Sequence, residues 1–218
     1  MIALDLFCGA GGASMGLSRA GFDVIGVDIK PQPRYPFDFV QADALRPPFN
    51  LRNFDLIWAS PPCQDSSVAS IVHKKAGKVY PQLIPEVRAL LLASGRPYVI
   101  ENVVGAPLHN PIKLCGLMFG LKVFRHRLFE CSFFALTTKC NHAGKKIGDG
   151  YFSIAGGAGR WKSWGTVHRN IMKGTRAEWR EAMDIDWMIR KELTQAIPPA
   201  YAQFIALKAK QVIERGAA

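Results

Sequence analysis

The 218-residue sequence has no apolar run near the roughly 18 residues that a helix needs to cross a bilayer, which excludes a membrane-spanning segment. It has no basic stretch ahead of its first apolar residues, and Asp5 interrupts them, so we expect no signal peptide. The five cysteines are odd in number and irregularly spaced, which argues against a disulfide scaffold and favours a reducing, cytoplasmic setting. Hydrophobic residues make up 49% and charged residues 21%, a balance that excludes wholesale disorder.

Acidic residues are scarce in one segment, and nearly all of the net charge of +11 lies there. Residues 113–180 hold 13 Lys and Arg against 3 Asp and Glu, whereas residues 1–112 hold 10 against 9 and residues 181–218 hold 5 of each. A concentrated basic surface favours a polyanionic partner, most often nucleic acid. Charge alone leaves a merely solvated basic face as an equal alternative.

Short apolar runs alternate with helical patterns through the first hundred residues. We expect strands at 3–7, 23–28, 39–43, 54–59 and 97–100, and helices at 13–20 and 82–93. This alternation predicts an α/β fold, a parallel sheet with helices on both faces. Ligands bind such sheets beyond the carboxyl ends of the strands, so we expect one site there, near Gly9, Asp28, Asp43, Cys63 and Glu101.

The rest of the chain has a different pattern. Residues 113–180 are rich in glycine and poor in periodicity, and residues 190–211 read as largely helical with an interruption at Pro198-Pro199. We expect three parts: a main domain over residues 1–127, a small irregular basic insert over 128–180 and a helical segment over 181–218 that returns to the main domain.

The glycine turn at residues 9–12 stands between a strand and a helix, where the missing side chains let the backbone approach a ligand. Asp28, one strand later, can accept hydrogen bonds from ribose hydroxyls, and Asp43 can contact an adenine amino group. The alternative is an ordinary tight turn with two solvated acids.

Four further residues carry reactive or charged groups. Two prolines fix the backbone ahead of Cys63, which suits a nucleophilic thiolate, although a lone cysteine is more often structural. Burial at a strand end raises the pKa of Glu101, so that it can donate a proton; the alternative is a local cap. Arg125 and Arg127 lie on one face of an extended segment and can hold a carbonyl or carboxylate, unless they are two surface arginines.

The order of these motifs resembles the DNA cytosine-5 methyltransferase family, in a small bacterial or phage form. The matching motifs, in chain order, are Asp5-Leu6-Phe7-Cys8-Gly9-Ala10-Gly11-Gly12, Pro61-Pro62-Cys63-Gln64, Glu101-Asn102-Val103, Arg125-x-Arg127 and Thr194-Gln195-Ala196-Ile197-Pro198-Pro199. The fold that the resemblance implies is the Rossmann-like sheet of class I S-adenosylmethionine-dependent methyltransferases. It implies that this methyl donor binds at Phe7, Gly9, Ala10, Gly11, Gly12, Asp28, Ile29, Asp43, Ala44, Pro62, Gln195 and Ile197.

The resemblance also implies a reaction on a cytosine flipped out of the duplex. Cys63 adds to carbon 6, Glu101 hydrogen-bonds N3 and the exocyclic amine, Arg127 contacts the base carbonyl and Arg125 supports the site. The partner is double-stranded DNA, bound by a monomer in the cytoplasm of a cell or of a viral host, near the nucleoid, for restriction-modification or phage modification. The expected DNA contacts are Gln64, Ser67, Lys74, Lys75, Arg160, Lys162 and Arg169.

The sequence departs from the family pattern in places and leaves alternatives open. The usual Gln, Phe and Asn are replaced by Val123, Ser66 and Gln195, and the target-recognition region is short, which predicts a short or degenerate target sequence. A tRNA cytosine as substrate, and a decayed relative that only binds DNA, are the alternatives. Cys131, Cys140 and His142, with Cys115 as a fourth candidate, are zinc-ligand types; their spacing matches no standard finger, so we predict no metal.

Overall fold

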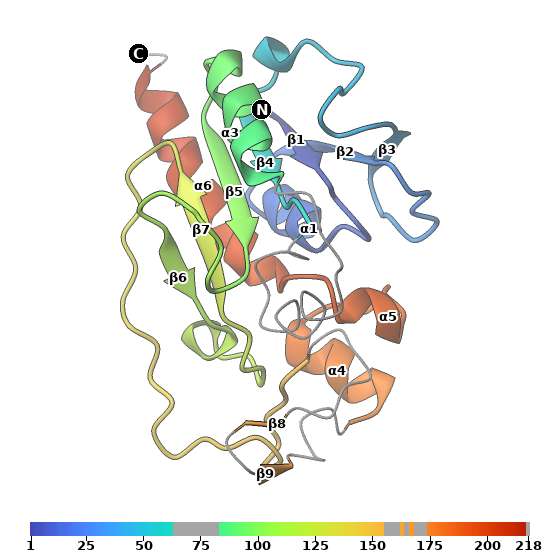
Figure 1. Ribbon diagram of the computed structural model, residues 1–218, viewed down its shortest axis with the longest axis vertical. Helices are drawn as coiled ribbons and strands as arrows, with labels where there is room; N and C mark the ends of the chain where they lie inside the picture. Colours follow the sequence, from blue (N-terminus) through green and yellow to red (C-terminus); the bar gives the residue numbers. More distant parts are fainter. Residues whose placement is uncertain (63–82, 155–161, 164–165, 168–173, 217–218) are drawn as a thin grey trace.

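A seven-stranded sheet, in the order β3-β2-β1-β4-β5-β7-β6, forms the centre of the protein (Figure 1). The computed structural model describes residues 1–62, 83–154, 162–163, 166–167 and 174–216. None of the helices in these ranges is both long and apolar enough to cross a membrane.

Five parallel strands make up the larger part of the sheet and confirm the predicted strands. They are β1 (Ile2–Leu6), β2 (Asp23–Asp28), β3 (Asp38–Gln41), β4 (Leu56–Ala59) and β5 (Tyr98–Asn102). Every residue of β4 and β5 is buried. That burial explains why these strands read as continuous apolar runs rather than as alternating ones, since both of their faces are covered.

The two remaining strands run antiparallel, whereas the sequence predicted only parallel ones. β7 (Arg127–Cys131) pairs with β5, and β6 (Ile112–Leu114) pairs with β7 at the edge of the sheet. A 3-10 turn, η2 (Gly116–Phe119), lies in the connection that reverses the chain between them. A local apolar pattern predicts that a segment is a strand but not the direction of its partner, so the sequence could not show this edge.

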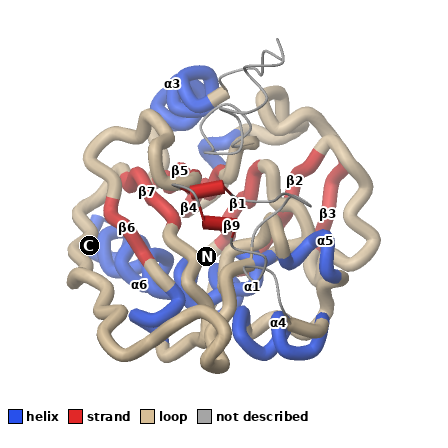
Figure 2. Tube along the Cα trace, turned by 60° about the horizontal axis from the view of Figure 1, so that its bottom comes forward, coloured by secondary structure: helices blue, strands red, loops and turns tan. Residues whose placement is uncertain are grey.

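Helices cover both faces of the sheet, as predicted (Figure 2). α1 (Gly12–Arg19) and α6 (Pro199–Gly216) pack together on one face, and α3 (Ile84–Ser94) lies on the other. The approach of α1 to the start of α6 requires glycine, because a Cβ at Gly16 would come within 2.2 Å of the Pro199 carbonyl oxygen. Pro199 stands at the first residue of α6, where a missing amide costs nothing.

A smaller apolar cluster joins the helices α4 (Arg176–Met183) and α5 (Arg190–Leu193) to the rest. It contains Trp179 and Met183 together with Val123 and Ile154, and it reaches Ala10 beside the glycine turn. The sequence analysis did not predict α4, although Thr175 and Glu178 form the reciprocal capping box that marks a helix start. The short elements η1 (Leu51–Asn53), β8 (Lys162–Ser163) and β9 (Thr166–Val167) complete the described structure. The three-part domain division stays a prediction.

Candidate active site

The carboxyl ends of the parallel strands bring the predicted site residues to one edge of the sheet. Because β1, β2, β4 and β5 run in the same direction, Phe7, Asp28, Ser60 and Glu101 all follow or end strands at that edge. Crevices outside such strand ends are where α/β sheets bind ligands.

The glycine turn is held from two sides. The Gly9 amide donates to Asp28 Oδ2 at 3.1 Å, which ties the end of β1 to the end of β2. Gly11, at the N-cap of α1, has a φ of 86°, a backbone conformation that suits glycine. Trp187 donates its indole N–H to the Ala10 carbonyl at 2.7 Å, a contact that the sequence analysis missed and that no local motif announces.

A buried carboxyl group lies directly beneath this turn. Asp5 in β1 is fully buried and accepts a hydrogen bond from the Ser14 hydroxyl, to which Tyr35 donates in turn at 2.8 Å. The pKa of Asp5 is raised to about 7, mainly by burial and further by the negative charges of Asp28 and Glu101, while the hydrogen bond from Ser14 opposes the rise. The sequence assigned Asp5 no role in the site, although an acid inside an apolar strand is itself a signal of a special environment.

The strand end that leads to the predicted nucleophile is fixed by its neighbour. Asn102, the last residue of β5, donates its side-chain N–H to the Pro61 carbonyl at 3.0 Å, and it is only 2% exposed. Trp58 donates to the Ser60 hydroxyl at 3.1 Å. The backbone just before Cys63 is therefore held by β4 and β5 together. Pro61 is buried and Pro62 is exposed.

Glu101 and Arg127 form the charged pair of the site. Arg127 Nε lies 3.0 Å from Glu101 Oε1, and both side chains are largely buried. Burial raises the pKa of Glu101, and the positive charges of Arg127 and Arg125 and a hydrogen bond from Ser60 reduce that rise without cancelling it. The positive charges of Arg127 and Arg125 therefore favour the ionised form of the Glu101 carboxyl group.

Arg125 joins three parts of the chain that are far apart in sequence. Its guanidinium donates to the Ile154 carbonyl and, at 2.9 Å, to the Thr194 carbonyl. Its own carbonyl accepts a hydrogen bond from Tyr201 in α6 at 2.5 Å. Because Arg125 is only 3% exposed, its charge faces protein rather than water. Its main structural effect is to attach the final motif to the strand that carries Arg127.

The other predicted cofactor residues are spread along the same edge. Asp43 is exposed and accepts a hydrogen bond from the Leu45 amide at 2.9 Å, while Ala44 is buried in the core beneath it. Ile29 is 65% exposed directly after Asp28. Ile197 is buried and its carbonyl contacts the position where a Gly12 side chain would begin, whereas Gln195 is exposed.

Several predicted residues lie outside the described residues. These include the predicted nucleophile Cys63 and most of the expected DNA contacts, namely Gln64, Ser67, Lys74, Lys75, Arg160 and Arg169, and only the backbone of Lys162 is described. Ser66 and the tryptophans Trp161 and Trp164 are also outside.

The strand order, the glycine turn and the acids at the strand ends define a Rossmann-like fold of the S-adenosylmethionine-dependent methyltransferase type. Solved structures support this fold. A protein described as a DNA modification methyltransferase encoded within an E. coli prophage has a TM-score of 0.60 at 17% identity, over 99% of both chains. The Dnmt2 methyltransferase of S. pombe has a TM-score of 0.60 at 13% identity, over 97% of this chain and 99% of that one.

Residues 1–111 match the family of C-5 cytosine-specific DNA methylases, and the chain belongs to this family. It is 33% identical over 128 residues to the type II methyltransferase M1.HphI of Haemophilus parahaemolyticus, a match that covers 49% of this chain and 33% of that protein. It is 31% identical over 133 residues to M.HgiDI of Herpetosiphon aurantiacus, covering 55% of this chain and 42% of that protein. The chain therefore spans less than half the length of these two relatives.

Proposed function

We propose that this protein transfers a methyl group from S-adenosylmethionine to carbon 5 of cytosine in DNA. The observation that carries the proposal is the buried Glu101–Arg127 pair beside the Pro61 backbone, in a chain of the C-5 cytosine-specific DNA methylase family. A carboxyl group with a raised pKa suits a proton donor, and a guanidinium beside it suits a base carbonyl. Both stand next to the strand end from which Cys63 follows.

The residues at the ends of β1 and β2 fit a nucleoside-bearing methyl donor. A Cβ at Gly9 would meet no atom of the described residues within 4 Å, which leaves open space among them above the turn. Asp28 uses one lone pair of each oxygen for the amides of Gly9 and Lys30, and carboxylate oxygens can accept further hydrogen bonds from ribose hydroxyls. The exposed side chain of Ile29 offers an apolar surface for a flat base. S-adenosylmethionine, when bound, supplies an electrophilic methyl group on a sulfonium.

The chain's own groups prepare the cytosine for that methyl group. Addition of the Cys63 thiolate to carbon 6 forms an S–C bond and makes carbon 5 enamine-like. Glu101 donates a proton to N3, which stabilises the charge that develops on the ring, while Arg127 holds the carboxyl group and the base carbonyl. After carbon 5 is methylated, water takes the carbon 5 proton, the S–C bond breaks to release the Cys63 thiolate, and N3 returns its proton to Glu101. The base must leave the stack for these contacts to form.

The basic segment supports a nucleic acid as the substrate class, and the DNA methylase family favours DNA. The excess charge of residues 113–180 suits phosphate contacts, which supply affinity without reading sequence. A region this short can make few base-edge contacts, and each good one contributes about 1–3 kcal/mol of discrimination, so the target is short or degenerate. We infer a monomer that works on double-stranded DNA in the cytoplasm, in restriction-modification or phage modification.

The direct test measures transfer of a labelled methyl group to mixed-sequence duplex DNA and to tRNA, followed by bisulfite sequencing of the DNA. We expect label in DNA, at cytosines that share a short sequence context. Label in tRNA alone would move the substrate to RNA, and label in neither, with S-adenosylmethionine still bound, would indicate a binder without activity. The variant Cys63→Ala must lose the transfer, and Cys131→Ala is its matched control, because Cys131 lies in β7 away from the site.

A further inference from the structure

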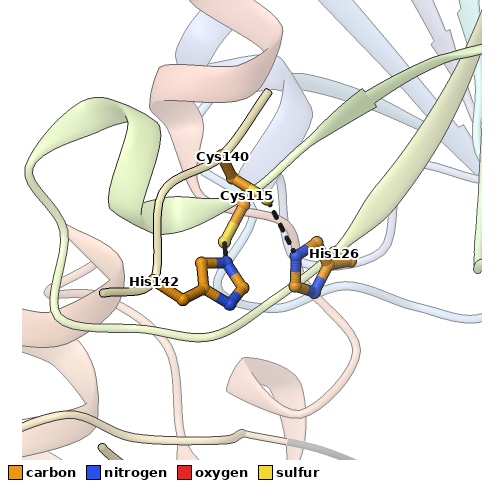
Figure 3. A group of neighbouring side chains, drawn as sticks. All are labelled: Cys115, His126, Cys140 and His142. Carbon is orange, nitrogen blue, oxygen red and sulfur yellow. Dashed lines mark hydrogen bonds between the residues drawn. The ribbon is translucent and has the colours of Figure 1, made fainter. Parts of the chain in front are cut away.

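Two cysteines and two histidines from separate segments meet at one point beside β7 (Figure 3). Cys115 follows β6, His126 stands between the two site arginines, and Cys140 and His142 lie in the segment after β7. One ligand atom from each of the four lies within 4.8 Å of the others. Cys115 is fully buried and the other three are half-buried, so the group is largely shielded from water.

The spacing of these atoms matches tetrahedral metal coordination. Cys115 Sγ lies 3.5 Å from His142 Nε2, and Cys140 Sγ lies 3.4 Å from His126 Nε2. Sulfur and nitrogen ligands bound at about 2.3 and 2.1 Å at tetrahedral angles are about 3.6 Å apart. Two sulfurs with two imidazole nitrogens form the donor set that selects zinc. The Phe124 ring packs edge-on against the His142 ring, with centroids 5.1 Å apart, and covers one side.

Few backbone hydrogen bonds hold the segment that carries Cys140 and His142. We call residues 132–150 the outer loop; it runs outside β6 as a long ribbon without regular strands or helices (Figure 1). From residue 133 to 141, no backbone group bonds to the backbone of another residue within the described ranges. Phe134 and Leu136 are 78% and 67% exposed, so they contribute little apolar burial. A loop of this length, with few such contacts, needs another restraint to keep one conformation.

We propose that Cys115, His126, Cys140 and His142 bind one structural zinc ion that attaches the outer loop to the base of β7. Binding of the ion releases the two thiol protons to solvent. The complex of Zn²⁺ with two thiolates and two neutral imidazoles has no net charge, which suits a site shielded from water. Four protein ligands leave no open position, so the ion is structural rather than catalytic. The proposal is independent of the proposed reaction.

This ligand set differs from what the sequence indicated. The sequence analysis grouped Cys131 with Cys140 and His142 and predicted no metal, whereas the structure brings His126 into the group in place of Cys131. No regular spacing could show it, because the four ligands come from three separate parts of the chain.

The test measures zinc content and coordination in the full-length protein. The purified chain, prepared without chelators, should carry about one zinc per chain. Cys140→Ser and His142→Asn should reduce the zinc content by about tenfold or more, and both changes lie in the outer loop, where they leave the sheet intact. Cys131→Ala and His109→Asn are the matched controls, since each removes the same residue type outside the group, and both should keep the zinc.

Cobalt substitution and proteolysis test the same site in the wild-type protein, so the result does not depend on whether a variant folds. Replacing zinc by Co²⁺ should give the strong visible absorption of a tetrahedral centre with a thiolate charge-transfer band, and zinc removal should speed trypsin cleavage after Lys139 or Lys146. Three outcomes would each overturn the proposal. They are a wild-type protein that takes up no zinc even on titration, variants that retain it, and a native mass that reveals a Cys115–Cys140 disulfide instead.

Discussion

The sheet and the outer loop follow each other directly in the chain but are held in place by different means. Phe129 in β7 is fully buried between the sheet and α6, whereas Phe134, five residues later, is 78% exposed. Apolar burial and strand pairing hold the sheet, whereas few backbone hydrogen bonds hold the described outer loop. The site residues Glu101, Asn102 and Arg127 belong to the sheet, since they lie on β5 and β7.

The largest effect is expected on the rate of methyl transfer, when a site residue at the edge of the sheet is changed. Glu101→Gln keeps the size of the side chain but cannot deliver a proton to N3, so methyl transfer should fall by roughly 10²–10⁴-fold. Single-turnover rates with labelled methyl donor would measure it, and Phe134→Ser in the outer loop should keep the wild-type rate. Equal losses in the two variants would contradict the division between the two regions.

The second-largest effect is expected on the free energy of unfolding, when the buried side chain of Phe129 is removed. Phe129→Ala leaves a cavity next to Trp58 and Tyr201, whose rings lie 5.8 and 6.1 Å from its own, and should lower the free energy of unfolding by about 3–5 kcal/mol. Urea denaturation followed by circular dichroism would measure the change. A loss below about 1 kcal/mol would show that β7 is not the packed strand described above.

The pH dependence of stability tests the buried carboxyl group of the sheet. Because the pKa of Asp5 is raised to about 7, the folded protein binds a proton that the unfolded chain releases above about pH 4. The contribution of Asp5 to stability should therefore fall by about 4 kcal/mol as the pH rises from about 4 to 7, and it should stay constant above that.

Asp5→Asn should remove this slope, because the amide has no proton to lose in that range. Denaturant titrations of both proteins at several pH values would provide the comparison. An identical pH dependence in the variant would contradict the raised pKa.

The smallest effect is expected in the outer loop. Phe134→Ser exposes no new apolar surface and breaks no described hydrogen bond, so it should change the free energy of unfolding by about 0.5 kcal/mol or less. The same denaturation measurement as for Phe129→Ala gives the contrast. A loss close to that of Phe129→Ala would contradict the exposed position of Phe134.

The sequence predicted the parallel strands and their ends because each signal was local. An apolar run that stops at Asp28, at Pro61 or at Glu101 shows both the strand and the group placed at its end. The antiparallel edge and the role of Arg125 as a link to Thr194 and Ile154 depend on contacts between distant segments, which no local pattern encodes. The sequence did not predict the group of Cys115, His126, Cys140 and His142 for the same reason.

Covalent trapping of the protein on duplex DNA that contains 5-fluorocytosine, with S-adenosylmethionine present, tests whether Cys63 is the nucleophile. Fluorine at carbon 5 cannot leave as a proton, so the S–C bond to Cys63 should persist and give a complex that survives denaturing electrophoresis. We predict this complex for the wild-type protein and none for Cys63→Ser. A complex that persists in Cys63→Ser, or a wild-type protein that methylates ordinary cytosine in DNA but never forms the complex, would contradict the account.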